Sequence, residues 1–429
     1  MEKVCIIGLG YVGYPLAKLC ADKGLDVVGL DLKKELVEKI NNHNEFFATT
    51  NFKDIKDCNI YIICVPTPID EKKEPDLTPL ISASKTVSKY LKENDLVVVE
   101  STVFPGTCDE VVLPILKESQ KNFYLAYCPE RINPGDSFWT TENIPRVIGA
   151  LSKAGLDISA KFYQKILGGE IFEIDEIKDL LRPKVIKQEN GYKLNSMPLN
   201  SITKMKTIRE AESVKVMENT VRDVNIAFIN ELAKICNVLD LDIVNIINGM
   251  TTKPFGKGPY YPGIGVGGHC IAVDPEWLKT TSIKAGFLPE IIQLSRNTNN
   301  KMPKFAINLL KKFVPINKTK IAVLGVAYKG NIEDARESPF FEIKKLLEEE
   351  NAAFEVFDPY CKNDSTINDL NEILDLCDSI ILITDHHEFR KLTPQLLNEK
   401  GIKYIIDGRN CLDQNGIKNI GIKYKGIGR

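Results

Sequence analysis

The sequence lacks several features that would place it in other classes of protein. It has only four histidines and no Cys-x-x-Cys pair, and its eleven cysteines are an odd number. These counts favour neither a zinc site nor a disulfide framework, so we expect reduced thiols and no metal. No apolar run approaches the ~18 residues of a membrane span. The start, MEKVCIIGLGYVG, lacks the parts of a secretory signal. We therefore expect a soluble, cytoplasmic protein.

An excess of charge of one sign is also missing. The 56 lysines and arginines nearly balance the 58 aspartates and glutamates, and the net charge is −2. Nucleic acids and anionic membranes attract basic surfaces, so we expect neither as a partner. The 429 residues are 43% hydrophobic and 27% charged, which is typical of a globular protein with two or three domains. Most cysteines, such as Cys5, Cys64 and Cys236, lie in apolar runs and should be buried.

Short apolar runs alternate with helical patterns in the first half of the chain. The run at 3–8 precedes a glycine turn, and Tyr14 to Lys23 has apolar residues at helical spacing. Near-continuous apolar runs of this kind suit a parallel sheet that helices cover on both faces. The segment 175–207 is polar and has no clear period, so we interpret it as a long connection or a small β excursion. The other predicted strands are LDVVGLD, NIYIICV (59–65), DLVVVES (95–101) and FYLAYCP (123–129).

The middle of the chain is predicted to be helical. From Ile208 to about Asn237 apolar residues recur every three or four positions without glycine or proline. A second helix is expected from about Asp242 to Asn248. The glycine-rich stretch KPFGKGPYYPGIGVGGHC then predicts a long loop, and further helices lead to about Phe313.

The C-terminal part repeats the order of elements found at the N-terminus. TKIAVLGVAYKG predicts a strand and a glycine turn, SPFFEIKKLLEEE an amphipathic helix, and AAFEVFDPY a strand that ends in an acidic residue. DSIILIT and YIIDGRN supply further strands. We therefore predict an α/β protein with two doubly wound domains, 1–206 and 316–429, which a central helical domain with a long helix (207–315) joins.

A glycine motif stands between the first predicted strand and the first helix. Gly8, Gly10 and Gly13 have the spacing of a dinucleotide-binding turn, and Asp31 ends the next strand. Asp31 would accept hydrogen bonds from ribose hydroxyls and repel a 2′-phosphate, which favours NAD over NADP. A turn without a ligand is the alternative. The other residues expected at the cofactor belong to this turn or follow strands of the same sheet: Tyr11, Val12, Thr67 and Thr102.

Cys270 is the cysteine whose position favours reactivity. It follows two glycines and precedes a predicted helix, whose N-terminus would lower the pKa of the thiol. Asp274 stands four residues later and would share a helix face with it. By itself a loop cysteine is more often inert. Lys215 and Asn219 are also four apart, and from the pattern alone a solvated helix face is the plainer interpretation.

Two other polar groups stand near strand ends. Glu130 follows a strand of the first domain, at the edge where doubly wound sheets bind ligands. His386 and His387 are adjacent, which is a poor arrangement for a metal, and we interpret them as a surface or loop feature.

Several motifs spanning nearly the whole chain occur in a recognisable order: GLGYVGYPLA, CVPTP, ESTVFPGT, PERINPG, ESVKVMENTVRDVNIAFINEL, GVGGHCIAVDP and YKGNIEDARESP. They resemble the motifs of the UDP-glucose/GDP-mannose dehydrogenase family. The resemblance implies an N-terminal Rossmann domain for NAD, a central domain that forms a homodimer, and a C-terminal Rossmann-like domain for the UDP-sugar. It also implies oxidation of a nucleotide-sugar C6 alcohol to a carboxylate with two NAD per turnover.

The resemblance assigns roles to residues that match the family's motifs. Cys270 would be the nucleophile that captures the C6 aldehyde and then carries a thioester. Lys215 would stabilise oxyanions at C6, with Asn219 matching the family's asparagine beside it. Asp274 would assist proton transfer, and Glu130 would act on water or on the thioester. Thr102 would lie near the nicotinamide. A thiol, an amine and two carboxylates form the set that covalent oxidation of an alcohol to an acid requires.

The residues around Cys270 resemble those of the family's N-acetylhexosamine branch. GGHCIAVDP is most similar to the enzymes that act on UDP-N-acetyl-D-mannosamine, whereas KPFG resembles those that act on UDP-N-acetyl-glucosamine. The epimer therefore stays open, with the galactosamine sugar and then UDP-glucose as further alternatives. The resemblance implies these substrate-binding residues: Glu130, Arg131, Lys215, Asn219, Arg222, Tyr260, Tyr261, Gly267, His269, Lys329, Arg336 and Arg409.

The chain departs from the family's pattern in three places. The segment between Asp31 and CVPTP is short, and the segment 175–207 is longer than usual. Lys253 stands near a position where many relatives have an arginine that reaches a neighbouring subunit, which puts that contact in doubt but not the dimer. Two other functions are alternatives: a two-electron dehydrogenase, which needs no cysteine, and a nucleotide-sugar-binding regulator without catalysis. A single NADH per turnover would favour the two-electron enzyme, whereas the presence of Lys215, Cys270 and Asp274 together argues against the regulator.

Overall fold

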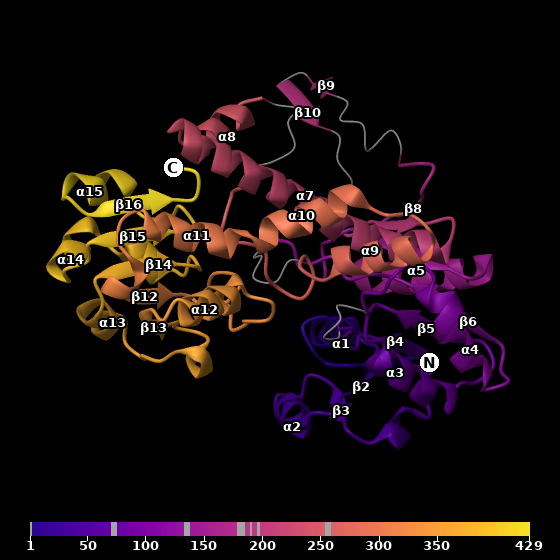
Figure 1. Cartoon of the computed structure of the whole chain (residues 1–429). Helices are drawn as coiled ribbons and strands as arrows, with labels where there is room; N and C mark the ends of the chain where they lie inside the picture. The colour runs from indigo at the N-terminus through magenta and orange to yellow at the C-terminus, as the bar shows by residue number, and fades with distance from the viewer. Residues whose placement is uncertain are drawn as a thin grey trace. The chain divides into compact units, whose positions relative to one another are not determined.

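The computed structural model describes residues 2–69, 75–132, 138–177, 185–188, 191–194, 198–253 and 259–429. The chain forms two compact units, Met1–Glu218 and Asn219–Arg429, and the division falls inside one long helix. Figure 1 colours the units along the chain from indigo to yellow. Each unit contains one parallel-type sheet with helices packed on it.

The sheet of the first unit has nine strands within the described residues, in the order β3-β2-β1-β4-β5-β6-β7-β11-β8. Neighbouring strands are parallel except β6 and β7. The strand order reverses between β1 and β4, and in open α/β sheets ligands bind at this point, beyond the carboxyl ends of the strands. The strands are β1 (Lys3–Ile7), β2 (Asp26–Leu30), β3 (Phe47–Thr49), β4 (Ile60–Ile63), β5 (Asp95–Val99), β6 (Phe123–Tyr127), β7 (Arg146–Ala150), β8 (Ile171–Glu173) and β11 (Ile202–Lys204).

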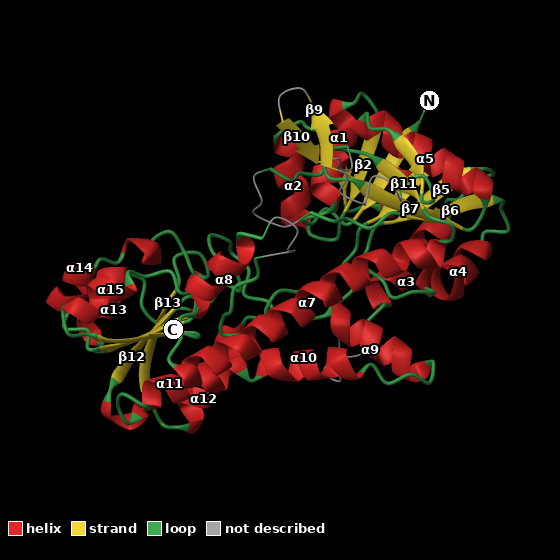
Figure 2. Cartoon of the chain, turned by 90° about the horizontal axis from the view of Figure 1, so that it is seen from above, coloured by secondary structure: helices red, strands yellow, loops and turns green. Residues whose placement is uncertain are grey.

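Helices cover both faces of this sheet, as the continuous apolar strands predict. Side chains of a strand alternate between faces. Val4 and Ile6 of β1 belong to one core cluster, and Cys5 and Ile7 belong to another. Helices α1 and α5 contribute to the first cluster and α3 to the second, and Figure 2 shows helices on both sides of the strands. The helices are α1 (Gly13–Asp22), α2 (Lys34–Asn42), α3 (Thr78–Ser88), α4 (Leu113–Lys117) and α5 (Lys153–Leu167).

The segment 175–207 contains a small β excursion, which was one of its two interpretations. Strands β9 (Val185–Gln188) and β10 (Gly191–Leu194) pair antiparallel in a sheet of their own. The chain then returns to the main sheet as β11, which pairs parallel with β7 and β8. Residues 178–184, 189–190 and 195–197 of this segment lie outside the described residues.

The long helix predicted in the middle of the chain is α7 (Ile208–Leu239), a single helix of 32 residues that Figure 2 shows without a break. It ends two residues beyond the predicted Asn237, before Asp240, whose φ of 54° is left-handed and stops a helix. Asp242 then caps the second helix, because its side chain accepts the backbone N–H groups of Val244 and Asn245. The further helices are α8 (Ile243–Thr251), α9 (Asp274–Lys284), α10 (Glu290–Asn300) and α11 (Met302–Lys311).

The second unit contains a five-stranded parallel sheet in the order β13-β12-β14-β15-β16. Ile321 and Val323 of β12 belong to one core cluster, and Ala322 and Leu324 belong to another, so this sheet is also buried on both faces. Its elements are β12 (Lys320–Leu324), α12 (Pro339–Glu349), β13 (Ala353–Phe357), α13 (Leu370–Leu376), β14 (Ser379–Leu382), α14 (Pro394–Glu399), β15 (Tyr404–Asp407), α15 (Gln414–Asn419) and β16 (Lys423–Gly426).

The two sheets begin with the same turn. Gly8 follows β1 and Gly325 follows β12, with φ values of 91° and 102° that L side chains rarely adopt. In each case the next backbone N–H donates to the acidic residue after the neighbouring strand, which is Asp31 at 2.8 Å in one sheet and Asp358 at 2.6 Å in the other. The internal duplication and the predicted fold class, two doubly wound sheets with a helical region between them in sequence, are confirmed.

Candidate active site

The three glycines of the first turn play two different parts. A Cβ on Gly8 would stand 2.7 Å from the carbonyl oxygen of Cys64, and one on Gly13 would stand 1.8 Å from that of Gly8. Both glycines are therefore required by close backbone packing. A Cβ on Gly10 would meet no described atom within 4 Å. The turn thus leaves open space at Gly10, directly before α1, which no side chain caps. This arrangement suits a pyrophosphate at a helix N-terminus.

The carboxylate of Asp31, directly after β2, is fixed by two backbone hydrogen bonds. One oxygen accepts the N–H of Leu9 at 2.8 Å, and the other accepts the N–H of Lys33 at 2.9 Å. These bonds orient the carboxylate, which is half-buried and keeps lone pairs for the two hydroxyls of a ribose. The open glycine turn and the oriented carboxylate together fit NAD.

Thr67 and Thr102 are brought together at the same edge of the sheet. They follow β4 and β5, and the Thr67 hydroxyl donates to the carbonyl oxygen of Thr102 at 2.7 Å. Beside them, the Ser101 hydroxyl donates to the carbonyl oxygen of Val65 at 2.8 Å. These two loops are thereby joined beyond the strand ends, next to the glycine turn that packs on Cys64.

Glu130 is held by a buried arginine that sequence reasoning missed. The Nη2 of Arg146 donates to Oε2 of Glu130 at 2.7 Å, and its Nη1 donates to Glu100 at 3.1 Å. The Oε1 of Glu130 accepts the N–H groups of Arg131 and Ile132. Arg146 and Glu100 are 0% and 2% exposed. The available signal was an arginine at the start of an otherwise apolar strand, RVIGA.

This buried cluster has one more carboxylate than it has cations. Burial raises the pKa of Glu100 to about 7, with Arg146 opposing the shift and Glu130 adding to it. The hydroxyl of Tyr163 also donates to Glu100. The Arg146 guanidinium stays charged, because two carboxylates raise its pKa despite burial. Glu100 is therefore the member of the cluster that takes up a proton near neutral pH.

Arg131 is engaged within the first unit. Its guanidinium donates to both oxygens of Glu218 and, at 3.0 Å, to the carbonyl oxygen of Pro145. A cavity of about 390 Å³ lies beside this pair, with Trp139 and Ile144 in its lining. A contact of Arg131 with the sugar stays a prediction.

Asn219 is not part of a solvated helix face. It is 6% exposed, and its Nδ2 donates to Oδ2 of Asp274 at 2.6 Å, where Asp274 is 2% exposed. The bond ties α7 to the first residue of α9, across 55 positions of sequence. Lys215 stands one turn earlier on α7 and is half-buried, while Arg222 is exposed. The plainer interpretation of Asn219 is therefore wrong.

Cys270 lies in the turn that leads into α9. It is half-exposed, and its carbonyl oxygen accepts the N–H groups of Val273 at 3.1 Å and Asp274 at 2.8 Å. The second bond has the spacing of an α-helix, although α9 itself begins only at Asp274. Cys270 therefore lies just before α9, and the two residues do not share a face within this helix. Asp274 is joined to Cys270 through the backbone hydrogen bond.

The glycine-rich loop before Cys270 is anchored on α7. Asn230 accepts the N–H of Gly263 at 2.9 Å and donates to Asn299 of α10 at 2.9 Å. Nearer the cysteine, the N–H of Gly268 donates to the carbonyl oxygen of Arg336 at 2.9 Å. The loop is thus bonded to α7 and to the segment 328–337, which we call the nucleotide loop.

Three of the predicted basic residues lie on or against the nucleotide loop. Lys329 is half-buried, and Arg336 is exposed with its guanidinium on Asp334 at 2.6 and 2.9 Å. Arg409 donates to the carbonyl oxygen of Tyr328 at 3.0 Å. Within the second unit, the structure therefore gathers these cations beside the Cys270 turn.

Gly267 and Gly268 pack closely against the nucleotide loop, and His269 follows them in the chain. A Cβ on Gly267 would stand 2.7 Å from the carbonyl oxygen of Glu337, and one on Gly268 would stand 2.8 Å from the ring of Tyr328. Burial opposes ionisation of Asp334, but Arg336 and His269 lower its pKa.

The two tyrosines of the loop differ in their surroundings. Tyr261 is 50% exposed, and its hydroxyl donates to Asn248 of α8 at 3.3 Å. Tyr260 packs against the core of the second unit. Lys253 is the last described residue before this loop, and residues 254–258, which include most of KPFG, lie outside the described residues.

His386 lies in the loop after β14, as one of the two interpretations of the histidine pair expected, but it does not lie at the surface. Its side chain is 0% exposed, and its Nε2 lies 3.0 Å from Oδ2 of Asp358. His387 is exposed, as expected. Burial arises because the chain after β14 packs against the turn that follows β13, a contact that no local pattern records. The expected burial of most cysteines is confirmed, since only Cys270 and Cys411 are half-exposed.

The chain matches three successive domains of one family of proteins. It matches the NAD binding domain of the UDP-glucose/GDP-mannose dehydrogenase family over residues 2–46 and 34–167, the central domain over 209–301, and the UDP binding domain over 322–414. The chain belongs to the UDP-glucose/GDP-mannose dehydrogenase family.

Relatives resemble the chain over its full length. It is 32% identical to the UDP-N-acetyl-D-mannosamine dehydrogenase of Methanococcus aeolicus, covering 100% of this chain and 95% of the relative. It is 33% identical to the UDP-N-acetyl-D-glucosamine 6-dehydrogenase of Pseudomonas aeruginosa, covering 94% and 97%. The solved structure of the UDP-D-ManNAc dehydrogenase from Pyrococcus horikoshii matches with a TM-score of 0.85 at 31% identity, covering 100% and 99%.

Family membership decides between the alternatives left open by the sequence. The protein is an NAD-dependent oxidoreductase of nucleotide sugars, so the predicted enzyme class and cofactor are confirmed and the regulator without catalysis is set aside. The UDP binding domain spans the nucleotide loop. Within the described residues, no helix is both long and apolar enough to cross a membrane.

The glycine turn predicts that one substitution in this dehydrogenase lowers stability and that another weakens cofactor binding. Gly13→Ala should lower the free energy of unfolding by several kcal/mol (~3 or more), because its Cβ overlaps a backbone carbonyl. Gly10→Ala should change it by less than ~1 kcal/mol and weaken NAD binding about tenfold or more, because the methyl occupies open space meant for the pyrophosphate. Urea denaturation and NAD titration measure the two effects. Unchanged NAD affinity in Gly10→Ala contradicts this placement of the cofactor.

The protonation of Glu100 predicts a pH dependence of stability. Because its pKa is raised to about 7, the folded protein holds this proton more tightly than the unfolded chain, whose glutamates titrate near ~4.3. The stabilisation of the folded protein by this proton is complete below a pH of ~4.3 and is lost as the pH rises through about 7. Glu100→Gln removes this dependence. The unfolding free energy of wild type relative to this variant should therefore change by ~2–3 kcal/mol between pH ~4.3 and about 7. Exposed Glu118→Gln is the control, and parallel curves for wild type and Glu100→Gln contradict the assignment.

Proposed function

We propose that this dehydrogenase oxidises the C6 alcohol of UDP-N-acetyl-D-mannosamine to the carboxylate in two NAD-dependent steps, with Cys270 as the covalent nucleophile. The observation that carries the proposal is the Cys270 turn, a half-exposed thiol backed by the buried bond between Asn219 and Asp274. The full-length likeness to enzymes named for UDP-N-acetyl-D-mannosamine supports the choice of sugar.

A covalent route suits this oxidation because the free aldehyde hydrates and escapes. NAD, when bound, accepts one hydride from C6 in each of the two oxidations. After the first, the sulfur of Cys270 adds to the aldehyde carbon, and the carbonyl oxygen takes up the thiol proton as a thiohemiacetal forms. The second removal of hydride, with loss of the hydroxyl proton, leaves a thioester on Cys270. Water then displaces the thiol and releases the carboxylate.

The supporting roles follow from charge and donor type. In this proposal Lys215 and Asn219 stabilise the oxygen at C6 as negative charge develops on it. Asp274, which already accepts a bond from Asn219, moves the proton. Glu130 keeps a fixed orientation through Arg146 and two backbone N–H groups, which suits a carboxylate that orients the attacking water. Thr102 follows β5, at the edge of the sheet where we expect the nicotinamide to bind.

The nucleotide loop supplies the proposed binding site for UDP. Lys329, Arg336 and Arg409 carry the positive charge that a diphosphate requires, and arginine adds bidentate geometry. The loop contacts the Cys270 turn through Gly268 and Arg336, which would set the distance between the diphosphate and the reacting carbon. The other proposed contacts to the nucleotide sugar are Arg131, Arg222, Tyr260, Tyr261, Gly267 and His269.

The proposal retains the predicted division into three domains, with boundaries after 206 and 315, and the cytoplasm as the place of action. Among the described residues, none of the eleven cysteines forms a disulfide bond, which suits a reducing compartment.

The covalent route is tested by counting NADH and acid. The wild type should form two NADH per UDP-N-acetyl-D-mannosamine, and Cys270→Ala should form no net acid because the thioester cannot form. Cys411→Ala, which alters the other half-exposed thiol, is the matched control and should keep the wild-type stoichiometry. Acid formation at the normal rate in Cys270→Ala would falsify the covalent route.

The substrate is tested by a panel of UDP-glucose and the UDP-linked N-acetyl derivatives of glucosamine, galactosamine and mannosamine. The highest kcat/KM should belong to the mannosamine sugar. A higher value for the glucosamine sugar would move the proposal to that epimer, which the Pseudomonas aeruginosa relative also acts on by its name. One NADH per turnover with every sugar contradicts the four-electron reaction.

A homodimer through the central helix is also part of the proposal. Val221, Phe228 and Ile235 recur every seven residues on α7 and are 56%, 59% and 46% exposed. A stripe with this spacing on a 32-residue helix is typical of a seam between two antiparallel or parallel copies. Large exposed apolar side chains in line mark an interaction surface. In a symmetric dimer the stripe of one protomer packs against the same stripe of its partner, so both are buried.

The dimer is tested by placing charge on this stripe. Phe228→Asp should shift the protein from dimer to monomer in analytical ultracentrifugation, because two carboxylates would be desolvated at the symmetric contact. Leu376→Asp, at a 44% exposed leucine on α13, is the control and should leave the dimer intact. A wild-type protein that sediments as a monomer at micromolar concentration refutes this part of the proposal.

A further inference from the structure

Asp358 occupies the position in the second sheet that Asp31 occupies in the first, but its surroundings differ. Asp31 is half-buried, whereas Asp358 is 1% exposed. Four backbone N–H groups donate to its two oxygens at 2.6–2.9 Å, and Nε2 of His386 adds a fifth bond at 3.0 Å. Burial opposes ionisation, but these donors outweigh it and hold the pKa of Asp358 well below its usual range. In this sheet the carboxylate binds protein groups in place of a ribose.

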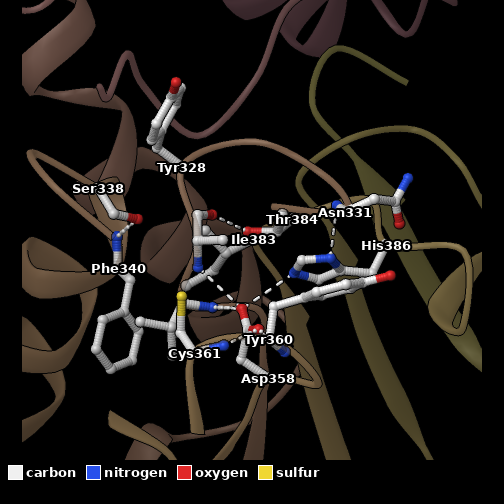
Figure 3. A network of polar contacts seen from close by, with 12 residues as sticks. Tyr328, Asn331, Ser338, Phe340, Asp358, Tyr360, Cys361, Ile383, Thr384 and His386 are labelled. Atoms are coloured by element: carbon white, nitrogen blue, oxygen red, sulfur yellow. Dashed lines mark hydrogen bonds and ion pairs between the residues drawn. The ribbon is translucent and has the colours of Figure 1, made fainter. Parts of the chain in front are cut away.

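The neighbours of His386 determine which nitrogen carries its proton. The backbone N–H of Asn331 donates to Nδ1 at 2.9 Å, so Nδ1 must be an acceptor without hydrogen. The carboxylate of Asp358 only accepts, so Nε2 must carry the hydrogen. The ring is further fixed by stacking on Tyr360 at 5.0 Å and by an edge contact with Phe389 at 5.3 Å. His386 is thus a neutral ring in a single tautomer, and Figure 3 shows it between Asn331 and Asp358.

Asn331 belongs to the nucleotide loop, two residues after Lys329. Its φ of 64° is left-handed, a conformation that costs energy outside glycine and needs external support. The support is reciprocal, because its N–H donates to His386 and its side-chain oxygen accepts the N–H of His387 at 2.9 Å. A Cβ on the adjacent Gly330 would stand 2.8 Å from the carbonyl oxygen of Asp385. The start of the loop is therefore seated directly on the segment that carries His386.

We infer that His386 is a positioning residue for the nucleotide sugar, and that it acts by accepting the Asn331 N–H and so holding the nucleotide loop in its binding conformation. The inference rests on the proposed function only in assigning the diphosphate to Lys329, Arg336 and Arg409. The hydrogen bonds and ring contacts of His386 all lie within the second sheet and its loops. Its effect should therefore fall on binding of the nucleotide and not on NAD.

Two substitutions separate the two hydrogen bonds of the ring. In His386→Asn the side-chain oxygen reaches the place of Nδ1 and still accepts from Asn331, while the bond to Asp358 is lost. In His386→Gln the longer side chain reaches the place of Nε2 and still donates to Asp358, while Asn331 loses its acceptor.

The experiment measures the Kd of UDP by calorimetry on the full chain, together with the KM values of the UDP-sugar and NAD and the melting temperature. His386→Gln should weaken UDP binding and raise the KM of the UDP-sugar about tenfold, whereas His386→Asn should stay within about threefold of wild type. The KM of NAD should be unchanged in both variants. Equal UDP affinities for the Asn and Gln variants, or a loss that follows the melting temperature alone, overturn the inference.

A second measurement is independent of the substrate. With only four histidines in the chain, ¹⁵N-histidine labelling gives few imidazole signals, and His386→Asn assigns the one of interest. The long-range ¹H–¹⁵N spectrum should show hydrogen on Nε2 and none on Nδ1. A ring that carries hydrogen on Nδ1 refutes the inference even if UDP binds. If UDP binds but the mannosamine sugar is not oxidised, the proposed substrate fails while the inference about His386 is still decided.

Discussion

A carboxylate that receives the backbone N–H after a glycine turn organises both sheets of this protein. In each sheet it fixes the turn that leaves the first strand, and it does so at the edge where ligands bind. Asp31 keeps part of its surface accessible and leaves room at Gly10, which suits a dinucleotide. Asp358 is closed over by His386 and supports a loop instead. The same local geometry therefore serves two purposes, depending on which groups pack beyond the strand ends.

Buried polar groups fix the orientation of candidate residues within each unit. Arg146 holds Glu130 at the edge of the first sheet, and Asn219 holds Asp274 at the start of α9. An unpaired charge or amide in such places would cost free energy, so each group constrains its partner strongly. Rigid support of this kind is what a reaction with two hydride transfers requires, because the same carbon must be presented twice in the same geometry.

The long helix α7 links these features along the chain. It carries Lys215, Asn219 and Asn230, of which the first two belong to the proposed chemistry and the third anchors the loop before Cys270. The exposed apolar stripe on the same helix then connects the proposed active site with the proposed dimer. In the proposal, one helix therefore carries both the catalytic side chains and the interface.

Local patterns in the sequence were sufficient for the fold class, the order of the elements, the glycine turn and the long helix. These depend on periods of two and 3.6 residues and on the backbone freedom of glycine, which nearby residues determine. The buried ion cluster at Arg146, the bond between Asn219 and Asp274, and the burial of His386 depended on tertiary structure. Each joins residues distant in sequence, and whether a polar side chain is buried or solvated depends on which distant segment packs against it.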